Sequence, residues 1–200
     1  MLLDKLKDYK VYLASKSPRR HEMLGSMAID FEYLPTQVDE FHPEGYSPVQ
    51  VAEFLSQHKL SPVPMDEYPA NALFIACDTI VVVDNQILEK PKDREEALRM
   101  LRTLSGREHL VISGLTVCNR AKQLTSHRST RVRFKQFSEA ELTYYVDNYY
   151  PMDKAGAYGI QEWIGYTGID YIEGSFFNVM GLPTQLLWEM LSEIVEVPAN

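Results

Sequence analysis

The amino-acid sequence predicts an α/β fold, in which strands and helices alternate along a compact chain of 200 residues. Residues 73–83 are nearly all apolar and rich in β-branched side chains, as expected of a central strand that is buried on both faces. Helix start signals, in which Ser or Asp is followed three residues later by Gln or Glu, lie between the expected strands. The length suits one domain, or two small lobes, and the sequence shows no internal repeat or low-complexity tract.

The remaining elements follow from apolar periodicity and from the cap residues at their ends. In chain order they are a strand at 11–14, a helix at 18–27, an extended segment at 31–38, a helix from Ser47, a hairpin arm at 86–88, a helix from Asp93 to Gly106, strands at 109–118 and 128–136, a helix from Ser138 to about Tyr149, and a last helix after Pro183. A tight turn at Asp84–Asn85 leads into the hairpin arm. The last helix turns a stripe of Leu, Met and Ile side chains toward the core.

The composition is that of an ordinary globular protein, with 45% hydrophobic and 24% charged residues. The net charge of −8 argues against a nucleic-acid binder, because such proteins depend on clustered positive charge to contact phosphates. An acidic protein still binds a polyphosphate where its basic groups converge on one site and a divalent cation helps.

Hydrophobic runs and cysteines indicate the compartment. No apolar run approaches the roughly 20 residues needed to span a bilayer, and the charges that follow Met1 rule out a signal peptide. Cys77 and Cys118 lie in apolar, strand-like runs without metal-ligand spacing, so we expect buried free thiols in a reducing compartment. These features predict a cytoplasmic protein with no membrane partner.

The stretch from Val11 to Arg20 is the strongest sign of a functional site. A short apolar strand leads into Ser15 and Ser17, and Arg19 and Arg20 then occupy the first turn of the helix. The positive end of the helix dipole disfavours cations there, by roughly 0.3–1 kcal/mol each. Backbone N–H groups, two hydroxyls and two guanidinium groups together favour an anion with several oxygens, such as a polyphosphate. The alternative is a solvated arginine pair at an ordinary helix start.

Asp78 interrupts the most apolar strand of the chain. A carboxylate there must be ion-paired, metal-bound or at the mouth of the strand, because burial without a partner costs several kcal/mol. The alternative is a purely structural cap or ion pair near a strand end. Taken alone, the charges at Asp39–Glu40 and Glu89–Lys90 are solvated loop groups, and Lys59 complements a helix dipole.

Two stretches rich in small residues lie in the C-terminal half. Residues 153–161 place two glycines and two alanines around one lysine, which lets the backbone approach a ligand closely. Residues 174–183 repeat this pattern and lead into the last helix. A glycine-rich turn and an ordinary loop are the respective alternatives.

In this order, the motifs resemble the Maf proteins, nucleoside triphosphate pyrophosphatases that are also known for effects on septum formation. The resemblance covers nearly the whole chain and rests on residues 13–20, Asp39–Glu40, Lys59, 77–79, 89–91, 104–106, 153–161 and 181–183. Each motif is weak alone, whereas the ordered set is highly specific. The resemblance implies an elongated mixed β-sheet flanked by helices, with two lobes around a central cleft, as in the related inosine triphosphate pyrophosphatases, and a homodimer.

The resemblance also implies a role for each matching residue. Asp78 corresponds to the general base. The phosphate and metal cluster corresponds to Ser15, Ser17, Arg20, Glu40, Lys59 and Lys90, and Glu40 and Asp78 would hold Mg²⁺ or Mn²⁺. The branch that acts on dTTP and UTP is matched at Arg19, Thr79 and Gln161, whereas the branch that prefers 7-methyl-GTP differs at the position of Arg19 and lacks the Ile-Gln ending. The chain departs from the family at Lys16 and Cys77, and neither change removes a catalytic residue.

We therefore expect residues 1–200 to form a single domain that hydrolyses dTTP and UTP to the monophosphate and pyrophosphate, with modified pyrimidine nucleotides as further candidate substrates. Thr79 and Gln161 would read the base, because an amide can both donate to and accept from the O4 and N3–H of a pyrimidine. One alternative is a non-catalytic nucleotide-binding regulator of cell division, and another is a hydrolase of phosphorylated metabolites that releases orthophosphate. The presence of both Asp78 and Glu40 favours the pyrophosphatase.

Overall fold

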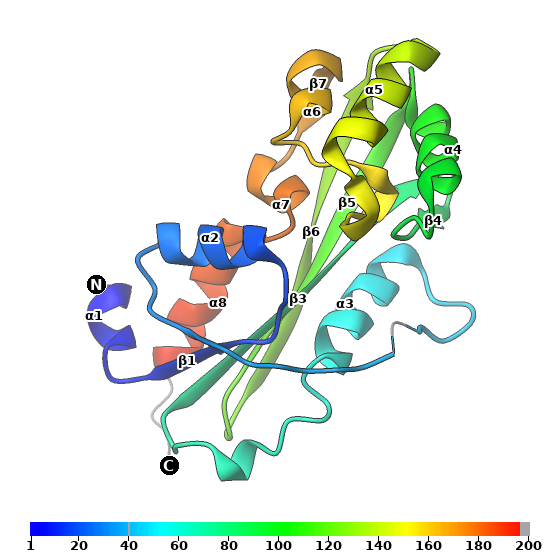
Figure 1. The fold of residues 1–200 in the computed structure, drawn as a ribbon. Helices are drawn as coiled ribbons and strands as arrows, with labels where there is room; N and C mark the ends of the chain where they lie inside the picture. Colours follow the sequence, from blue (N-terminus) through cyan, green and yellow to red (C-terminus); the bar gives the residue numbers. More distant parts are fainter. Residues whose placement is uncertain (40, 197–200) are drawn as a thin grey trace. The chain divides into compact units, whose positions relative to one another are not determined.

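A mixed sheet of seven strands is the framework of residues 1–39 and 41–196, which the computed structural model describes (Figure 1). The strand order is β2-β1-β3-β5-β6-β7, with β4 paired to β3. The strands are β1 (Lys10–Leu13), β2 (Glu32–Tyr33), β3 (Ala72–Val83), β4 (Gln86–Leu88), β5 (Glu108–Cys118), β6 (Gln123–Phe134) and β7 (Ile169–Glu173). Strand β1 runs parallel to β2 and β3, whereas β4 and β7 run antiparallel to β3 and β6, respectively. The predicted α/β class with a mixed sheet is confirmed.

The chain divides into two compact units. Unit 1 contains Met1–Asp78, Ser113–Arg128 and Gly181–Asn200, and unit 2 contains Thr79–Ile112 and Ser129–Met180. Strands β3, β5 and β6 each pass from one unit into the other along the chain. The expected single domain over residues 1–200 stays a prediction.

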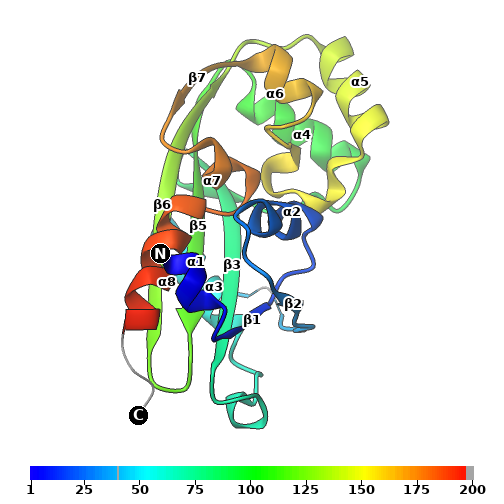
Figure 2. The same ribbon diagram turned by 90° about the vertical axis from the view of Figure 1, so that its left-hand side faces the viewer.

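The described part of unit 1 contains four helices and one 3₁₀ turn. They are α1 (Leu2–Leu6), α2 (Pro18–Ser26), α3 (Pro48–His58), the 3₁₀ turn η1 (Met65–Glu67) and α8 (Thr184–Glu196). The predicted capping box begins α3, because the N–H of Gln50 donates to the Ser47 hydroxyl and the N–H of Ser47 donates to the Gln50 amide oxygen. Helix α1 lies beside α8, as Figures 1 and 2 show. The predicted inward stripe of α8 is buried.

The core of unit 1 fixes the strand end at which Asp78 lies. Tyr12 of β1 stacks on Phe74 of β3, with ring centroids 5.4 Å apart. Leu13 is paired with Ile75 in the parallel register, so the chain that follows β1 leaves the sheet beside residues 76–78. Apolar packing along β1 and β3 therefore brings the sequence after residue 13 next to Asp78.

Unit 2 holds α4 (Arg94–Leu104), α5 (Glu139–Tyr149), α6 (Trp163–Gly168) and α7 (Phe176–Met180), with the 3₁₀ turns η2 (Pro151–Asp153) and η3 (Ala155–Ala157) between α5 and α6. Helices α4 and α5 lie side by side (Figures 1 and 2), and their apolar side chains pack in one core with Phe134 and Tyr158. The predicted caps of both helices are present, at Asp93 and Ser138. Asp84 and Asn85 have φ angles of 49° and 61°, as the predicted tight turn into β4 requires.

Several elements differ from the prediction. The segment 31–38 is a strand only at Glu32–Tyr33, and β6 begins at Gln123 rather than near residue 128. Helices α1, α6 and α7 and strand β7 were not predicted. They are only five or six residues long, too short for apolar periodicity to be recognised.

The cysteines agree with the sequence analysis. Cys77 and Cys118 are free and buried, as predicted. Burial raises the pKa of the Cys118 thiol to about 12, so this side chain stays a neutral thiol at neutral pH. Within the described part of the chain, no helix has the length and hydropathy that crossing a membrane requires.

Candidate functional site

The loop that joins β1 to α2 forms a small polar turn. Ser17 occupies the N-cap position with Pro18 following, as predicted, but its hydroxyl makes no capping bond. Its N–H instead donates to the hydroxyl oxygen of Ser15, 3.2 Å away. Ser15 is only 7% exposed, whereas Lys16 between them is exposed. This bond forms a short turn at residues 15–17, in which Lys16 is the exposed residue.

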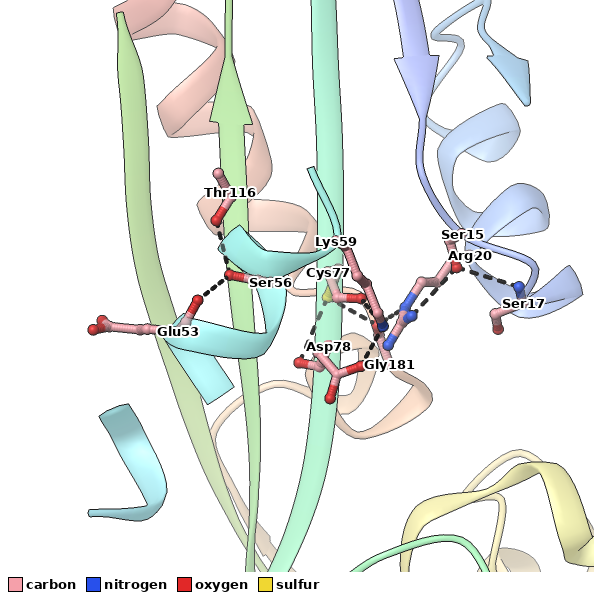
Figure 3. Close-up of polar contacts among 10 residues, drawn as sticks. All are labelled: Ser15, Ser17, Arg20, Glu53, Ser56, Lys59, Cys77, Asp78, Thr116 and Gly181. Atoms are coloured by element: carbon pink, nitrogen blue, oxygen red, sulfur yellow. Dashed lines mark hydrogen bonds and ion pairs between the residues drawn. The ribbon is translucent and has the colours of Figure 1, made fainter. Parts of the chain in front are cut away.

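Arg20 is held in place by two groups of unit 1. Its Nε donates to the carbonyl oxygen of Gly181 at 2.7 Å, and its Nη1 donates to the Ser15 hydroxyl at 3.3 Å (Figure 3). The side chain is only 9% exposed, although it lies in the first turn of α2, where the helix dipole disfavours a cation. Arg19 is half-buried. A buried, oriented guanidinium contradicts the alternative of an ordinary solvated pair for Arg20.

Lys59 and Asp78 form an ion pair at the end of α3. Lys59 is the C-cap residue of α3, so its positive charge complements the negative end of the helix dipole, as the sequence alone suggested. Its Nζ also donates to the Asp78 carboxylate and, at 3.1 Å, to the carbonyl oxygen of Cys77 (Figure 3). The side chains of Lys59 and Asp78 are 15% and 13% exposed, respectively. Asp78 is thus paired, as a buried carboxylate must be.

Cys77 joins the lysine side of this cluster to the arginine side. Its carbonyl accepts from Lys59, and its thiol donates to the carbonyl oxygen of Gly181 at 3.3 Å. The same oxygen of Gly181 accepts from Arg20. Gly181 has a φ of 113°, a conformation that favours glycine over any other residue. Cys77 and Gly181, to which no role was assigned, therefore link the pair of Lys59 and Asp78 to Arg20.

Helix α3 is seated on β5 by close backbone contact. A Cβ at Gly114 would lie 1.9 Å from the carbonyl oxygen of Ala52, so only glycine permits this approach. The hydroxyl of Ser56 bonds to that of Thr116 at 2.8 Å and donates to the carbonyl oxygen of Glu53 (Figure 3). These contacts set the position of the helix end that carries Lys59.

His21 supports the turn at Ser15 from the other side. Its Nε2 donates to the carbonyl oxygen of Ser15 at 2.6 Å, and its ring packs edge-on against Phe31 at 5.4 Å. Sequence reasoning assigned no role to His21 or Ser56, and it gave Cys77 and Gly181 no individual role although both lie in the motifs that it singled out. His21 carried a local signal because it directly follows the paired arginines, and Gly181 carried one because it lies in the stretch 174–183 that is rich in small residues.

In unit 2, the Gly-Ala run packs against the segment that precedes Lys90. The N–H of Gly156 donates to the carbonyl oxygen of Glu89 at 3.1 Å. Gly156 has a φ of 67°, and a Cβ there would lie 3.0 Å from the side chain of Val81. Thr79 shares the face of β3 with Val81, because side chains alternate along a strand. The run therefore lies over the Thr79 face of β3, and Lys90 is exposed beside it.

Gln161 lies at the end of this run and is half-buried. Its Oε1 is buried and has no hydrogen-bond partner among the described residues. An unpaired buried acceptor is costly in an ordinary structural position. This atom is consequently a candidate for ligand recognition.

Glu40, predicted as a metal and phosphate ligand, lies outside the described residues. Among residues 1–39 and 41–196, no group of three or more His, Cys, Asp or Glu side chains is arranged to hold a metal ion. A divalent cation bound to Asp78 would therefore take its other ligands from the substrate or from residues outside the described part of the chain. Phosphate oxygens are the ligands that Mg²⁺ commonly takes in such sites.

The unit 1 cluster has the chemistry of an oxyanion site with an adjacent base. Arg20 and Lys59 supply positive charge, Ser15 supplies a hydroxyl, and Asp78 supplies a carboxylate that can accept a proton. A guanidinium, together with an ammonium that is paired with a carboxylate, suits a phosphorylated substrate that reacts with water.

Comparison with known proteins agrees with this chemistry. The family model described as Maf-like protein matches residues 10–194. A dTTP/UTP pyrophosphatase of Porphyromonas gingivalis is 46% identical over 198 residues, which cover 98% of this chain and 99% of that protein. Proteins with the same name from Bacteroides thetaiotaomicron and Flavobacterium johnsoniae are 43% and 40% identical, covering 96% and 98% of this chain and all of each relative. The chain therefore belongs to the Maf family.

Proposed function

We propose that this chain is a nucleoside triphosphate pyrophosphatase that hydrolyses dTTP and UTP between the α- and β-phosphates. The observation that carries the proposal is the buried cluster of unit 1, in which Asp78, Lys59 and Arg20 are linked through Cys77 and Gly181. The pyrimidine substrates are supported by the name of the relatives, which are dTTP/UTP pyrophosphatases. Modified pyrimidine nucleotides are further candidate substrates.

Each residue of the cluster has a task in the proposed reaction. Ser15, Ser17 and Arg20 bind phosphate oxygens, and the N–H of Ser17 also stabilises the turn that carries Ser15. Asp78 accepts a proton from the attacking water as the bridging P–O bond breaks. Lys59 stabilises the negative charge that develops on the departing pyrophosphate.

A divalent metal, Mg²⁺ or Mn²⁺, fits this site. Mg²⁺ is usually held by one or two carboxylates together with substrate phosphates, and Asp78 supplies one partly accessible carboxylate. We propose Asp78 and Glu40 as its protein ligands. When bound, the metal would neutralise phosphate charge and lower the pKa of a bound water.

Residues of unit 2 complete the proposal. Lys90 is exposed and can contact phosphate oxygens, whereas Thr79 and Gln161 are neutral and suit the polar edge of a pyrimidine. Arg19 matches the residue of the dTTP and UTP branch, so we assign it to substrate binding. We also propose a cytoplasmic homodimer, for which light scattering of the purified protein is the test of assembly.

Product identification tests the reaction. Purified protein is incubated with dTTP and UTP, with and without Mg²⁺, and the products are identified by phosphorus NMR. Monophosphate and pyrophosphate, formed only with metal, are expected. Orthophosphate with a nucleoside diphosphate would show a different hydrolase, and tight nucleotide binding without turnover would indicate a non-catalytic regulator.

A further inference from the structure

The hydroxyl of Ser15 is held between two hydrogen-bond donors of unit 1. Its oxygen accepts from the N–H of Ser17 at 3.2 Å and from Nη1 of Arg20 at 3.3 Å (Figure 3). A serine hydroxyl has two acceptor lone pairs and one donor proton. Because both lone pairs are engaged, the hydroxyl can bind a further group only by donating its proton. Phosphate oxygens are acceptors, so they are suitable partners for this proton.

The direction of that proton depends on the backbone of Ser15, which is held on both sides. On the N-terminal side, the N–H of Ala14 donates to the carbonyl oxygen of Ile75 in β3 at 2.8 Å. On the C-terminal side, the carbonyl oxygen of Ser15 accepts from Nε2 of His21 at 2.6 Å. A carbonyl oxygen can only accept, so this contact places the proton of a neutral imidazole on Nε2. His21 is therefore the side chain that holds the peptide group after Ser15.

Two aromatic rings orient the imidazole of His21. Its ring packs edge-on against Phe31, with centroids 5.4 Å apart, and lies 5.7 Å from the ring of Tyr33. Tyr33 belongs to β2, where it is paired with Leu13 at the end of β1. The strand pairing that positions the end of β1 thus also positions a ring beside the imidazole that holds the following turn.

We infer that His21 is a positioning residue that, by holding the carbonyl oxygen of Ser15, directs the Ser15 hydroxyl toward a phosphate oxygen of the substrate. This inference rests on the proposed function, in which Ser15 binds phosphate. The imidazole donates to a backbone carbonyl rather than to a group assigned to proton transfer. Loss of this bond should therefore weaken phosphate binding and leave the chemical step nearly unchanged.

Two substitutions at His21 test the hydrogen bond. Steady-state kinetics gives kcat and KM for dTTP, and calorimetry gives the Kd of inorganic pyrophosphate, which has phosphate groups but no base. His21→Leu removes the donor and is expected to raise both KM and Kd about three- to tenfold, with kcat changed less than about twofold. His21→Gln, which carries an N–H donor at a similar reach, should restore values close to those of the wild type.

Ser26→Leu is the matched control, because it introduces the same side chain at an exposed position of α2 without a change in charge. Its KM and Kd should equal those of the wild type. If His21→Gln is as impaired as His21→Leu and both losses follow the melting temperature, the role of His21 is purely structural and the inference is wrong. His21→Phe, which keeps an aromatic ring but has no donor, replaces His21→Leu if that variant does not fold.

A double-mutant cycle tests whether His21 acts through Ser15. In a Ser15→Ala background the hydroxyl is missing, so the further change His21→Leu is expected to raise the Kd of pyrophosphate by less than about twofold. Fully additive losses would show that His21 acts independently of Ser15 and would overturn the inference.

Ser15→Ala alone separates the inference from the proposed function. If Ser15→Ala raises the Kd of pyrophosphate whereas His21→Leu does not, the positioning role is wrong and phosphate binding by Ser15 stands. If Ser15→Ala leaves the Kd unchanged, phosphate binding by Ser15 is wrong, and the positioning role falls with it. If both variants weaken pyrophosphate binding but the wild type does not hydrolyse dTTP, the proposed reaction fails and the positioning role stands.

Discussion

Lys59 donates a hydrogen bond to Asp78 from a helix end 19 residues earlier in the chain, and both side chains are largely buried. This pair places a cation directly on the carboxylate that we propose as the base. Because Lys59 also bonds to the Cys77 carbonyl, its ammonium is positioned by the strand as well as by the carboxylate. The pair thus provides the two opposite charges that hydrolysis of a phosphoanhydride requires at neighbouring positions.

Asp78→Asn is expected to reduce kcat for dTTP by roughly 10²–10⁴-fold, because Asn keeps the size of the side chain but cannot accept the proton of water. Nucleotide binding should largely persist, since Arg20 and Lys59 remain. Steady-state kinetics and isothermal titration calorimetry measure the two effects. Asp84→Asn, in the exposed turn after β3, is the control. An Asp78→Asn protein with near wild-type turnover would exclude Asp78 as the base.

Arg20→Lys should raise the KM for dTTP at least about tenfold, because a lysine cannot hold the Gly181 carbonyl and the Ser15 hydroxyl in the fork geometry of a guanidinium. The control is Arg128→Lys, which changes an arginine of unit 1 that bonds to Gln185 and Glu189 of α8. Equal KM values for both variants and the wild type would contradict the phosphate-binding role of Arg20.

Gln161→Glu should lower kcat/KM for dTTP and UTP by at least about tenfold, or roughly 1.4 kcal/mol, because it removes the amide donor and adds a charge at preserved length. Metal dependence and the position of bond cleavage should stay unchanged. The assay compares pyrimidine with purine triphosphates under identical conditions. Equal losses for both classes would mean that Gln161 does not read the base.

Stability should fall in mild acid through His109. Burial lowers the pKa of this side chain to about 4, and the residue is only 3% exposed. The unfolded chain, with a pKa of about 6.5, binds more protons between these pH values, so stability is lost as the pH falls from about 6.5 toward 4. Urea denaturation should show a loss of about 2 kcal/mol from pH 7 to pH 5 that is absent in His109→Gln. An identical pH dependence in both proteins would contradict this assignment.

Gly114→Ala should destabilise the protein by about 1–3 kcal/mol or more, since its Cβ would collide with the carbonyl oxygen of Ala52. Turnover should also fall, because the collision displaces the helix that carries Lys59. Gly25→Ala is the matched control, as a Cβ there meets no atom within 4 Å. Chemical denaturation of both variants provides the comparison, and equal stabilities would show that α3 can shift without cost.

Local chemistry made much of the fold predictable. The capping boxes at Ser47 and Ser138 and the turn at Asp84–Asn85 are encoded within four residues, and each was correctly predicted. The start of β6 was placed too late because its first residues are polar and only half-buried, so they lack an alternating pattern. Helix α6 contains Gly165 and Gly168, which weaken any helical signal.

The candidate site was predictable only in part, because its contacts join distant segments. Asp78 could be singled out since a carboxylate in an apolar strand needs a partner, but the strand alone does not say that the partner is Lys59. The roles of Gly181 and Cys77 depend on a carbonyl oxygen and a thiol, which have no signature of charge.

The bond between Arg20 and Gly181 also bears on the synthesis of the chain, because 161 residues separate its donor from its acceptor. A ribosome adds about 5–20 residues per second, so roughly 8–30 s pass between the emergence of the arginine and that of its carbonyl partner. The nascent protein thus carries the motif of residues 13–20 for most of translation without the carbonyl that accepts from Nε of Arg20. A product that terminates before Gly181 would keep this motif, with the Ser15 hydroxyl still available to Arg20, but would lack that bond.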